Sequence, residues 1–156
     1  MGIQWRAAGA ERLIPLERFA RLSHLSRVRL YSLQKADGPG RWERPDDRLG
    51  IVSLPDRDGS GEDESFADTA AIIQGMDLIV ACNPVVGHIA GAMGRPVFLT
   101  LPWLGDWRRM RLPDRTPRYP VTRLLRMTRW SDSDRVMARV AAEIAAALAR
   151  RAAGVS

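Results

Sequence analysis

Short apolar runs alternate with amphipathic segments along most of the chain. Clear examples of the apolar runs are VRLYSLQ at residues 28–34, MDLIVAC at 76–82 and PVFLTL at 96–101. This alternation is typical of a parallel sheet that is covered by helices on both faces. A chain of 156 residues has the length of one ordinary domain. We therefore predict an α/β fold in a single domain over residues 1–156, with a Rossmann-like parallel sheet of about six strands.

The order of these runs predicts the individual elements. The last helix has the clearest pattern, because its apolar stripe runs from Val136 to Leu148 at helical spacing, after caps and negative charge between Ser131 and Asp134. Other helices are predicted over residues 15–25, over 66–75 with Ser65 as its cap, and from the turn after Cys82 to Met93. Strands are predicted over residues 2–5, 28–34, 49–54, 76–82 and 96–101, with an edge strand at 122–127.

The turn after the predicted strand 76–82 bears most directly on function. The segment VACNPVVGHIAGAMGRP, Val80–Pro96, combines an asparagine, two prolines, three glycines and one of the two histidines. Ligands of open parallel sheets gather beyond the carboxyl ends of the strands, where helix N-termini expose unpaired N–H groups. The segment is therefore either an ordinary strand-to-helix turn or a place where a ligand meets the backbone.

Helical spacing predicts different roles for the residues of this segment. On a helical wheel, His88 points roughly 150° away from the side expected to face the core, so we expect either a phosphate or sugar contact or a surface or capping role. Gly87 falls in the first turn, which favours a ligand contact. For Gly91 and Gly94 we favour tight packing of the helix on a strand, and Gly94 is also predicted to end the helix. The expected core-facing side consists of Val86, Ile89, Ala90 and Met93.

Composition excludes several classes of protein. Cys82 is the only cysteine and the chain has two histidines, so neither a disulfide framework nor a metal site made by protein ligands is expected. The first residues lack the apolar run of a signal peptide, and no segment has the ~18 consecutive apolar residues of a membrane helix. We therefore expect a cytoplasmic protein without a membrane span.

The net charge is +6, and arginines concentrate in one region. Eight of them lie between Arg108 and Arg129. Two interpretations are open: a solvated rim, partly balanced by Asp106 and Asp114, or a surface that faces anions. Aromatic residues alternate with these arginines, as in proteins that bind single-stranded nucleic acid. The resemblance described next explains the same region, so nucleic acid is not expected as a partner.

The segment FADTAAIIQGMDLIVACNPVVGHIAGAMGRPVFLTLPWLGDWRRM, Phe66–Met110, resembles the C-terminal half of heptosyltransferase-like glycosyltransferases of family nine. The similarity is greatest to bacterial members attached to tetratricopeptide repeats. Matching blocks continue outward through residues 14–35 and 118–127, so the resemblance covers most of the chain. It implies half of a GT-B architecture, in which two Rossmann-like domains face each other and the C-terminal one holds the nucleotide-sugar donor.

The resemblance implies a binding site for the diphosphate and sugar of the donor. The family motif D-T-A-x-x-H falls on Asn83, Pro84, Val85 and His88, with Gly87 directly before the histidine. His88 matches the motif. Asn83 replaces the family aspartate and Pro84 replaces the threonine, which removes a carboxylate, a hydroxyl and a backbone N–H. These replacements affect the expectation of catalysis most, and no catalytic residue is assigned.

Four further residues match the family at the same expected edge of the sheet. Trp5 ends the first predicted strand, Gln34 and Lys35 end the second, and Arg108 follows the strand 96–101. Lys35 is the only lysine, and it either pairs with a phosphate or is a solvated loop charge. The resemblance implies that these residues contribute to donor binding.

Two functions follow from the resemblance. The first is a glycosyltransferase domain that binds a nucleoside diphosphate sugar and transfers a hexosyl or heptosyl group when an acceptor domain is supplied by another chain or lies outside this sequence. The nucleotide sugar is a substrate, so no cofactor is expected. The second is a catalytically inactive descendant used for protein association, with another protein or with a second copy of itself.

Overall fold

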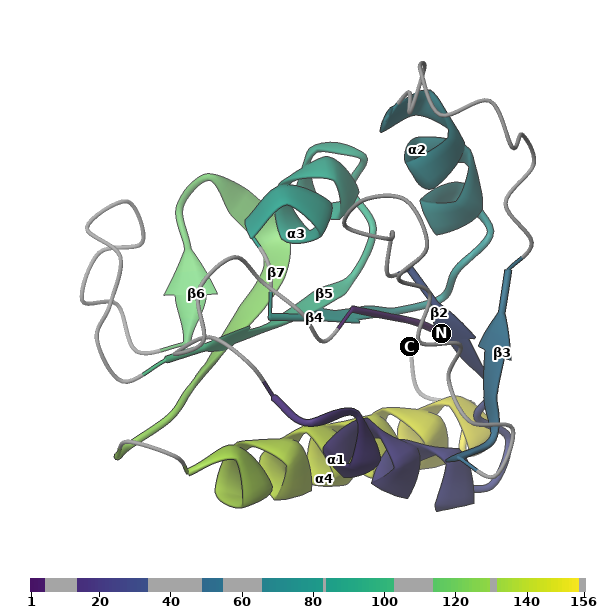
Figure 1. The fold of residues 1–156 in the computed structure, drawn as a ribbon, viewed down its shortest axis with the longest axis vertical. Coiled ribbons are helices and arrows are strands. Elements are labelled where there is room, and N and C mark those ends of the chain that lie inside the picture. Colours follow the sequence, from purple (N-terminus) through teal and green to yellow (C-terminus); the bar gives the residue numbers. More distant parts are fainter. Residues whose placement is uncertain are drawn as a thin grey trace, which may run out of the picture.

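A computed structural model describes residues 1–4, 14–33, 49–54, 66–82, 84–102, 114–129 and 132–154. Its strands form one sheet in the order β3-β2-β1-β4-β5-β7-β6 (Figure 1). All neighbouring strands are parallel except β6, which pairs antiparallel with β7. The strands are β1 (Gly2–Gln4), β2 (Leu30–Ser32), β3 (Ile51–Ser53), β4 (Ile79–Ala81), β5 (Val97–Leu101), β6 (Arg115–Thr116) and β7 (Tyr119–Arg126).

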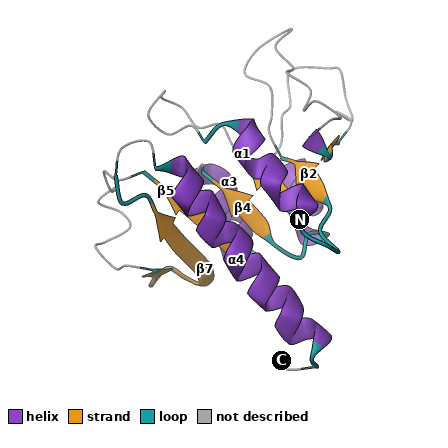
Figure 2. Ribbon diagram, turned by 90° about the horizontal axis from the view of Figure 1, so that it is seen from below, coloured by secondary structure: helices purple, strands orange, loops and turns teal. Residues whose placement is uncertain are grey.

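Helices cover both faces of this sheet. The elements α1 and α4 lie together on one face, and α2 and α3 lie on the other (Figures 1 and 2). The helix α1 continues directly into the 3₁₀ turn η2. The bounds are α1 (Leu16–Ala20), η2 (Arg21–His24), α2 (Phe66–Gln74), α3 (Pro84–Ala92) and α4 (Ser133–Ala152).

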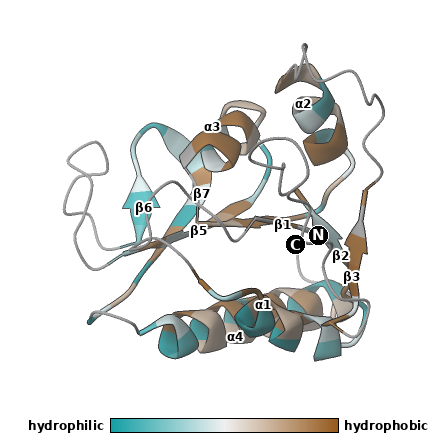
Figure 3. Cartoon of the chain, in the orientation of Figure 1, coloured by the Kyte–Doolittle hydropathy of each residue, from teal (hydrophilic) through white to brown (hydrophobic). Residues whose placement is uncertain are grey.

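Strand alternation divides the apolar residues between two core layers. Successive side chains of a strand point to opposite faces. In and just after β4, Val80 and Cys82 accordingly join the layer beneath α1 and α4, while Ile79 and Ala81 join the layer beneath α2 and α3. The apolar sides of the helices face these layers (Figure 3). Strands buried on both faces explain why the sequence shows continuous apolar runs rather than alternation.

The helix α4 packs through the stripe that its sequence predicts. Val136, Val140 and Ile144 are buried, and Leu148 packs against the same layer with partial burial. In the first turn of α4, Asp134 pairs with Arg18 of α1. A carboxylate is favourable at this position because the first turn of a helix has unpaired N–H groups and is the positive end of the helix dipole. This ion pair ties the start of α4 to α1.

The fold class predicted from the sequence is confirmed, with differences in several elements. The strand predicted at 122–127 is not an edge strand, because β7 lies between β5 and the additional short strand β6. The helix predicted over 15–25 changes to 3₁₀ geometry at Arg21, and Leu25 is extended.

The expected cap of the last helix also differs from the structure. Asp132 is the residue before α4, and its side chain caps no helix N–H. Its carboxylate instead accepts a hydrogen bond of 2.7 Å from the Thr128 hydroxyl. The predicted cap of α2, Ser65, lies outside the described residues.

Candidate functional site

The direction in which strands are added to the sheet changes between β1 and β4. The chain builds outward from β1 through β2 and β3, then returns to the other side of β1 with β4, β5 and β7. Gln4 of β1 is in register with Ala81 of β4, so the carboxyl ends of these parallel strands lie side by side. Ligands of open α/β sheets bind at such a point. We call the carboxyl ends of β1 and β4, together with the first turn of α3, the switch edge.

The helix α3 begins at the switch edge. Pro84, its first residue, suits this position because the first N–H of a helix has no partner within the helix. Val86 and Ala90 are buried and hold α3 on the sheet, whereas Val85 is 43% exposed. The backbone N–H groups and the dipole at a helix start favour an anion. The first turn of α3 therefore brings anion-favouring backbone to the point where the strand order reverses.

Five of the residues predicted to bind the donor lie outside the described part of the chain. They are Trp5, Gln34, Lys35, Asn83 and Arg108. For Pro84 the structure describes the backbone only, as the start of α3. Of the predicted set, Val85, Gly87 and His88 can therefore be placed with their surroundings.

Gly87 is buried and faces β5 rather than solvent. A Cβ atom at this position would lie 3.0 Å from Cδ1 of Leu99, closer than nearly all real Cβ contacts. Close packing of α3 on β5 is therefore sufficient to explain the glycine. The residue also lies in the wall of the hollow described below.

His88 lies on the flank of α3 that faces β7. Its ring meets the Tyr119 ring edge-on, with 5.6 Å between centroids and 64° between planes. On the core-facing side, Val86 and Ala90 are buried as predicted, and His88 is half-buried beside the Tyr119 ring rather than part of the buried core. Met93 was expected on that side but is 37% exposed, because α3 ends at residue 92 and the chain turns through Gly94 at φ 70°.

A small hollow lies between α3 and the hairpin of β6 and β7. Its walls come from α3, β5 and the hairpin, and its volume is about 20 Å³, room for about one water molecule. We call it the hairpin hollow; the residues lining it are Gly87, His88, Leu99, Thr116, Arg118, Tyr119, Thr122 and Leu124. Sequence reasoning found Gly87 and His88 but gave no role to Thr116, Tyr119 and Thr122. Arg118 was counted only as part of the arginine-rich region.

Cys82 follows β4 but is not available for chemistry at neutral pH. Its side chain is 5% exposed within the layer beneath α1 and α4. Burial raises the pKa of the Cys82 thiol to about 12, and nearby backbone N–H groups of Ile14 and Cys82 offset this only in part. The thiolate is the nucleophilic form, so this residue is structural.

The arginines of the described part of the 108–129 region do not share one surface. Arg118 lines the hairpin hollow on the α3 side of the sheet. Arg123 points to the opposite side, where its Nη1 lies 2.5 Å from Oε2 of Glu143 in α4. Arg115 and Arg129 are exposed. In the part that can be described, these charges belong to separate local environments.

The described residues can be searched for a metal site and for a helix that crosses a membrane. No group of three or more His, Cys, Asp or Glu side chains there is placed to hold a metal ion. Among the described helices, none combines the length and apolar character needed to cross a bilayer.

Comparisons with known proteins found no protein similar to this chain. No family model matches the chain, and neither the search of curated proteins nor that of solved structures found a match. The resemblance to family-nine glycosyltransferases therefore rests on the sequence blocks quoted above.

Proposed function

We propose that this chain is a glycosyltransferase-like domain that binds the diphosphate of a nucleotide-sugar donor at the switch edge. The strand order is the observation that carries the proposal. It reverses between β1 and β4, and α3 begins directly after β4. In this arrangement a diphosphate interacts with helix N–H groups, as in other doubly wound folds.

The chemistry of this proposal depends on charge stabilisation. A departing nucleoside diphosphate gains negative charge, which the N–H groups at the start of α3 stabilise without any change in their arrangement. By resemblance, Lys35 and Arg108 add positive charge. Asn83 has no carboxylate and cannot accept a proton as a general base. We assign no residue of this chain as the base that activates the acceptor.

Nucleotide titration of the full chain tests the proposal. We expect UDP, GDP or ADP to shift amide resonances from Val85 to His88 in ¹H–¹⁵N spectra, with a Kd of about 1 mM or tighter. The matching nucleoside without phosphates is the control ligand and should shift them much less. The absence of shifts with all three diphosphates would contradict donor binding.

The second function, an inactive module for protein association, is favoured by exposed apolar residues. Phe66 in the first turn of α2 is 61% exposed, and Val85 in the first turn of α3 is 43% exposed. Exposed large apolar side chains can mark an interface, and these two lie on helices that pack together.

Restoring the family motif separates the two functions. The double variant Asn83→Asp, Pro84→Thr regains the carboxylate, the hydroxyl and the N–H of the motif. If the switch edge is a donor site altered only at these positions, the variant binds the nucleoside diphosphate more tightly than the parent chain. Unchanged or absent binding, together with self-association in a dilution series, supports the association module.

A further inference from the structure

The parallel strands of the sheet begin at the edge opposite the switch edge. We call this edge, with the turns that lead into β2, β4, β5 and β7, the amino edge. The strands β2, β1, β4, β5 and β7 are neighbours in this order, so the residues that lead into them form a row. Neighbouring strands are about 4.8 Å apart, and the row from Arg29 to Val121 is therefore roughly 19 Å long. A partner bound along this row leaves the switch edge open.

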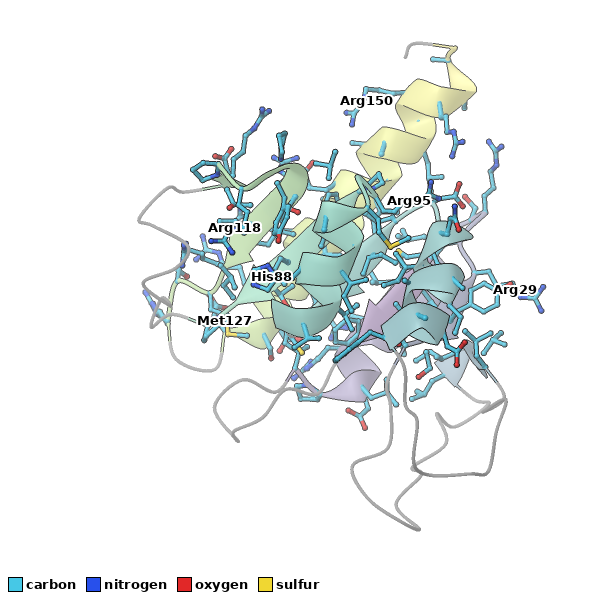
Figure 4. The ribbon with its side chains drawn as sticks, turned by 90° about the horizontal axis from the view of Figure 1, so that it is seen from above. Arg29, His88, Arg95, Arg118, Met127 and Arg150 are labelled. Atoms are coloured by element: carbon cyan, nitrogen blue, oxygen red, sulfur yellow. The ribbon has the colours of Figure 1, made fainter. Side chains whose placement is uncertain are left out.

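Arginines determine the charge of the amino edge. Nη1 of Arg151, at the end of α4, lies 3.5 Å from Oδ1 of Asp77, two residues before β4. This pair places the end of α4 at the amino edge. In Figure 4, Arg29, Arg95 and Arg150 lie on the side of the molecule away from Met127, which follows the carboxyl end of β7. The arginines of the amino edge are Arg27, Arg29, Arg95, Arg118, Arg150 and Arg151, and all except Arg95 are exposed.

Asp77 is the only carboxylate at the amino edge among the described residues. The other described carboxylates belong to the starts of α1, α2 and α4, to the middle of α4 or to the segment before β6. The helices α2, α3 and α4 end at the amino edge, but a helix end contributes only a partial negative charge. The edge therefore has an excess of positive charge, which favours contact with an extended anionic surface.

Two large apolar side chains are exposed at the same edge. Met93, after the end of α3, is 37% exposed, and Val121 in β7 is 41% exposed. Thr122 is in register with Val97, so Val121 is level with Pro96, which is itself exposed. Exposed apolar residues surrounded by polar ones mark sites of contact with proteins or membranes. Aliphatic side chains among cations are the combination with which peripheral proteins bind acidic lipids.

We propose that the amino edge docks on the surface of a membrane that contains acidic phospholipids. The arginines bind lipid phosphates, because a guanidinium presents paired N–H donors to phosphate oxygens. Met93 and Val121 enter the boundary between the headgroups and the acyl chains. Single-stranded nucleic acid suits this edge less well, because its bases stack on aromatic rings and the two exposed large apolar side chains there are aliphatic. In this orientation the switch edge faces the solution.

Vesicle sedimentation of the full chain tests the proposal. Vesicles made of equal parts of phosphatidylglycerol and phosphatidylcholine should bind the chain at least about tenfold more tightly than vesicles of phosphatidylcholine alone. Raising the NaCl concentration from about 0.1 M to about 0.5 M should weaken this binding, since salt screens exposed charges. Equal binding to the two kinds of vesicle, or binding to neither, would overturn the proposal.

Two arginines of α4 provide a matched pair of variants. Arg150 lies at the amino edge, whereas Arg135 is exposed in the first turn of the same helix, at the opposite edge. Arg150→Gln should weaken binding to the acidic vesicles about fivefold, and Arg135→Gln should change it less than about twofold. If both variants weaken binding equally, the amino edge is not the docking surface.

Two valines test the apolar part of the contact. Val121→Ser should weaken vesicle binding about fivefold, and the loss should persist at about 0.5 M NaCl because this contact is not electrostatic. The matched control for vesicle binding is Val85→Ser, since Val85 is 43% exposed at the start of α3, on the opposite edge. An equal loss in the two variants would contradict docking through the amino edge.

Other occupants of the amino edge would give different results. Salt-sensitive binding of a random oligonucleotide that Arg150→Gln weakens, without vesicle binding, assigns the edge to nucleic acid. A dimer that Val121→Ser dissociates, without vesicle binding, assigns it to a second copy of the chain. Either result overturns the proposal. Neither bears on the proposed function at the switch edge, which nucleotide shifts from Val85 to His88 test separately.

Discussion

Gly91 is the point at which α3 comes closest to β7. A Cβ atom there would lie 2.7 Å from Cγ of Tyr119 and 3.1 Å from Oγ1 of Thr122. The first distance is shorter than any real Cβ contact, so the absence of a side chain sets how deeply α3 lies against the hairpin. The packing role that the sequence favoured is confirmed for Gly91 and wrong for Gly94, where a Cβ atom would meet no described atom within 4 Å.

Substitution of Gly91 by alanine should therefore destabilise the protein. We expect the free energy of unfolding to fall by about 1–3 kcal/mol, because overpacking at Tyr119 outweighs the roughly 1 kcal/mol by which alanine favours a helix. Urea denaturation measures the change. Gly75→Ala is the control, since the nearest atom to its Cβ would be Ile72 O at an ordinary 3.6 Å. Equal stability of the two variants would contradict this packing.

The buried Cys82 thiol predicts a loss of stability in alkaline solution. Its pKa is raised from the ordinary 9.0 to about 12 in the folded chain. Below about pH 9 the thiol is protonated in both states, and its contribution to stability is fully present. As the pH rises from about 9 to about 12, the unfolded chain releases the proton first. The free energy of unfolding then falls by at most about 1.4 kcal/mol per pH unit.

Cys82→Ala isolates this contribution. The variant should be less stable at neutral pH, because it leaves a small cavity, but its stability should fall less steeply above pH ~9 than that of the parent chain. Urea denaturation at a series of pH values gives both slopes. Parallel slopes would show that the thiol titrates alike in the folded and unfolded chain.

At the level of single elements, the sequence predicted the helices and strands whose apolar pattern is complete within one segment of the chain. The strands β4 and β5 are continuous apolar runs, and the stripe of α4 repeats from Val136 to Leu148, over about three turns of helix. In each of these elements, the spacing of its own apolar residues shows which of its faces must be buried. The pattern alone therefore identified the type of the element and its place in the order.

Elements that depend on a distant partner were not predicted. The strand β6 has two residues, too few to show a periodic pattern. It forms because the chain turns between Thr116 and Tyr119, so that β6 pairs antiparallel with β7. The same pairing makes β7 begin at Tyr119, earlier than its apolar residues indicate. Local sequence contains no signal for this contact.

The candidate site was predictable to the same extent. The sequence indicated the turn after β4, whereas the reversal of strand order that defines the switch edge comes from the structure. The hairpin hollow brings His88 together with Thr116 and Thr122, which are separated from it by β5 and by residues outside the described part. Thr122 stands among apolar residues of a strand, and only the structure shows that its hydroxyl lacks a partner.

At the scale of the whole molecule, the most protected region should be the centre of the sheet. The strands β1 and β4 each have a strand on both sides and helices on both faces, whereas β3 and β6 are the ends of the sheet. Ile3 and Val80 are completely buried. Opening their amides to solvent requires the hydrogen bonds between the central strands of the buried sheet to break.

Hydrogen exchange tests this expectation. The amides of Ile3 and Val80 should exchange at least about tenfold more slowly than those of Val52 in β3 and Thr116 in β6. Exchange by NMR on the intact chain gives these rates residue by residue. Uniform rates across the sheet would mean that the molecule opens only as one unit.

The pairing of α1 with α4 determines when the chain can fold during synthesis. These helices lie side by side (Figure 2) although most of the described chain separates them. Until a ribosome has made α4, the apolar side chains of Ile3, Leu30 and Leu125 lack their final cover. A nascent chain that already contains every strand therefore still displays an apolar surface, which a chaperone can hold until the last helix emerges.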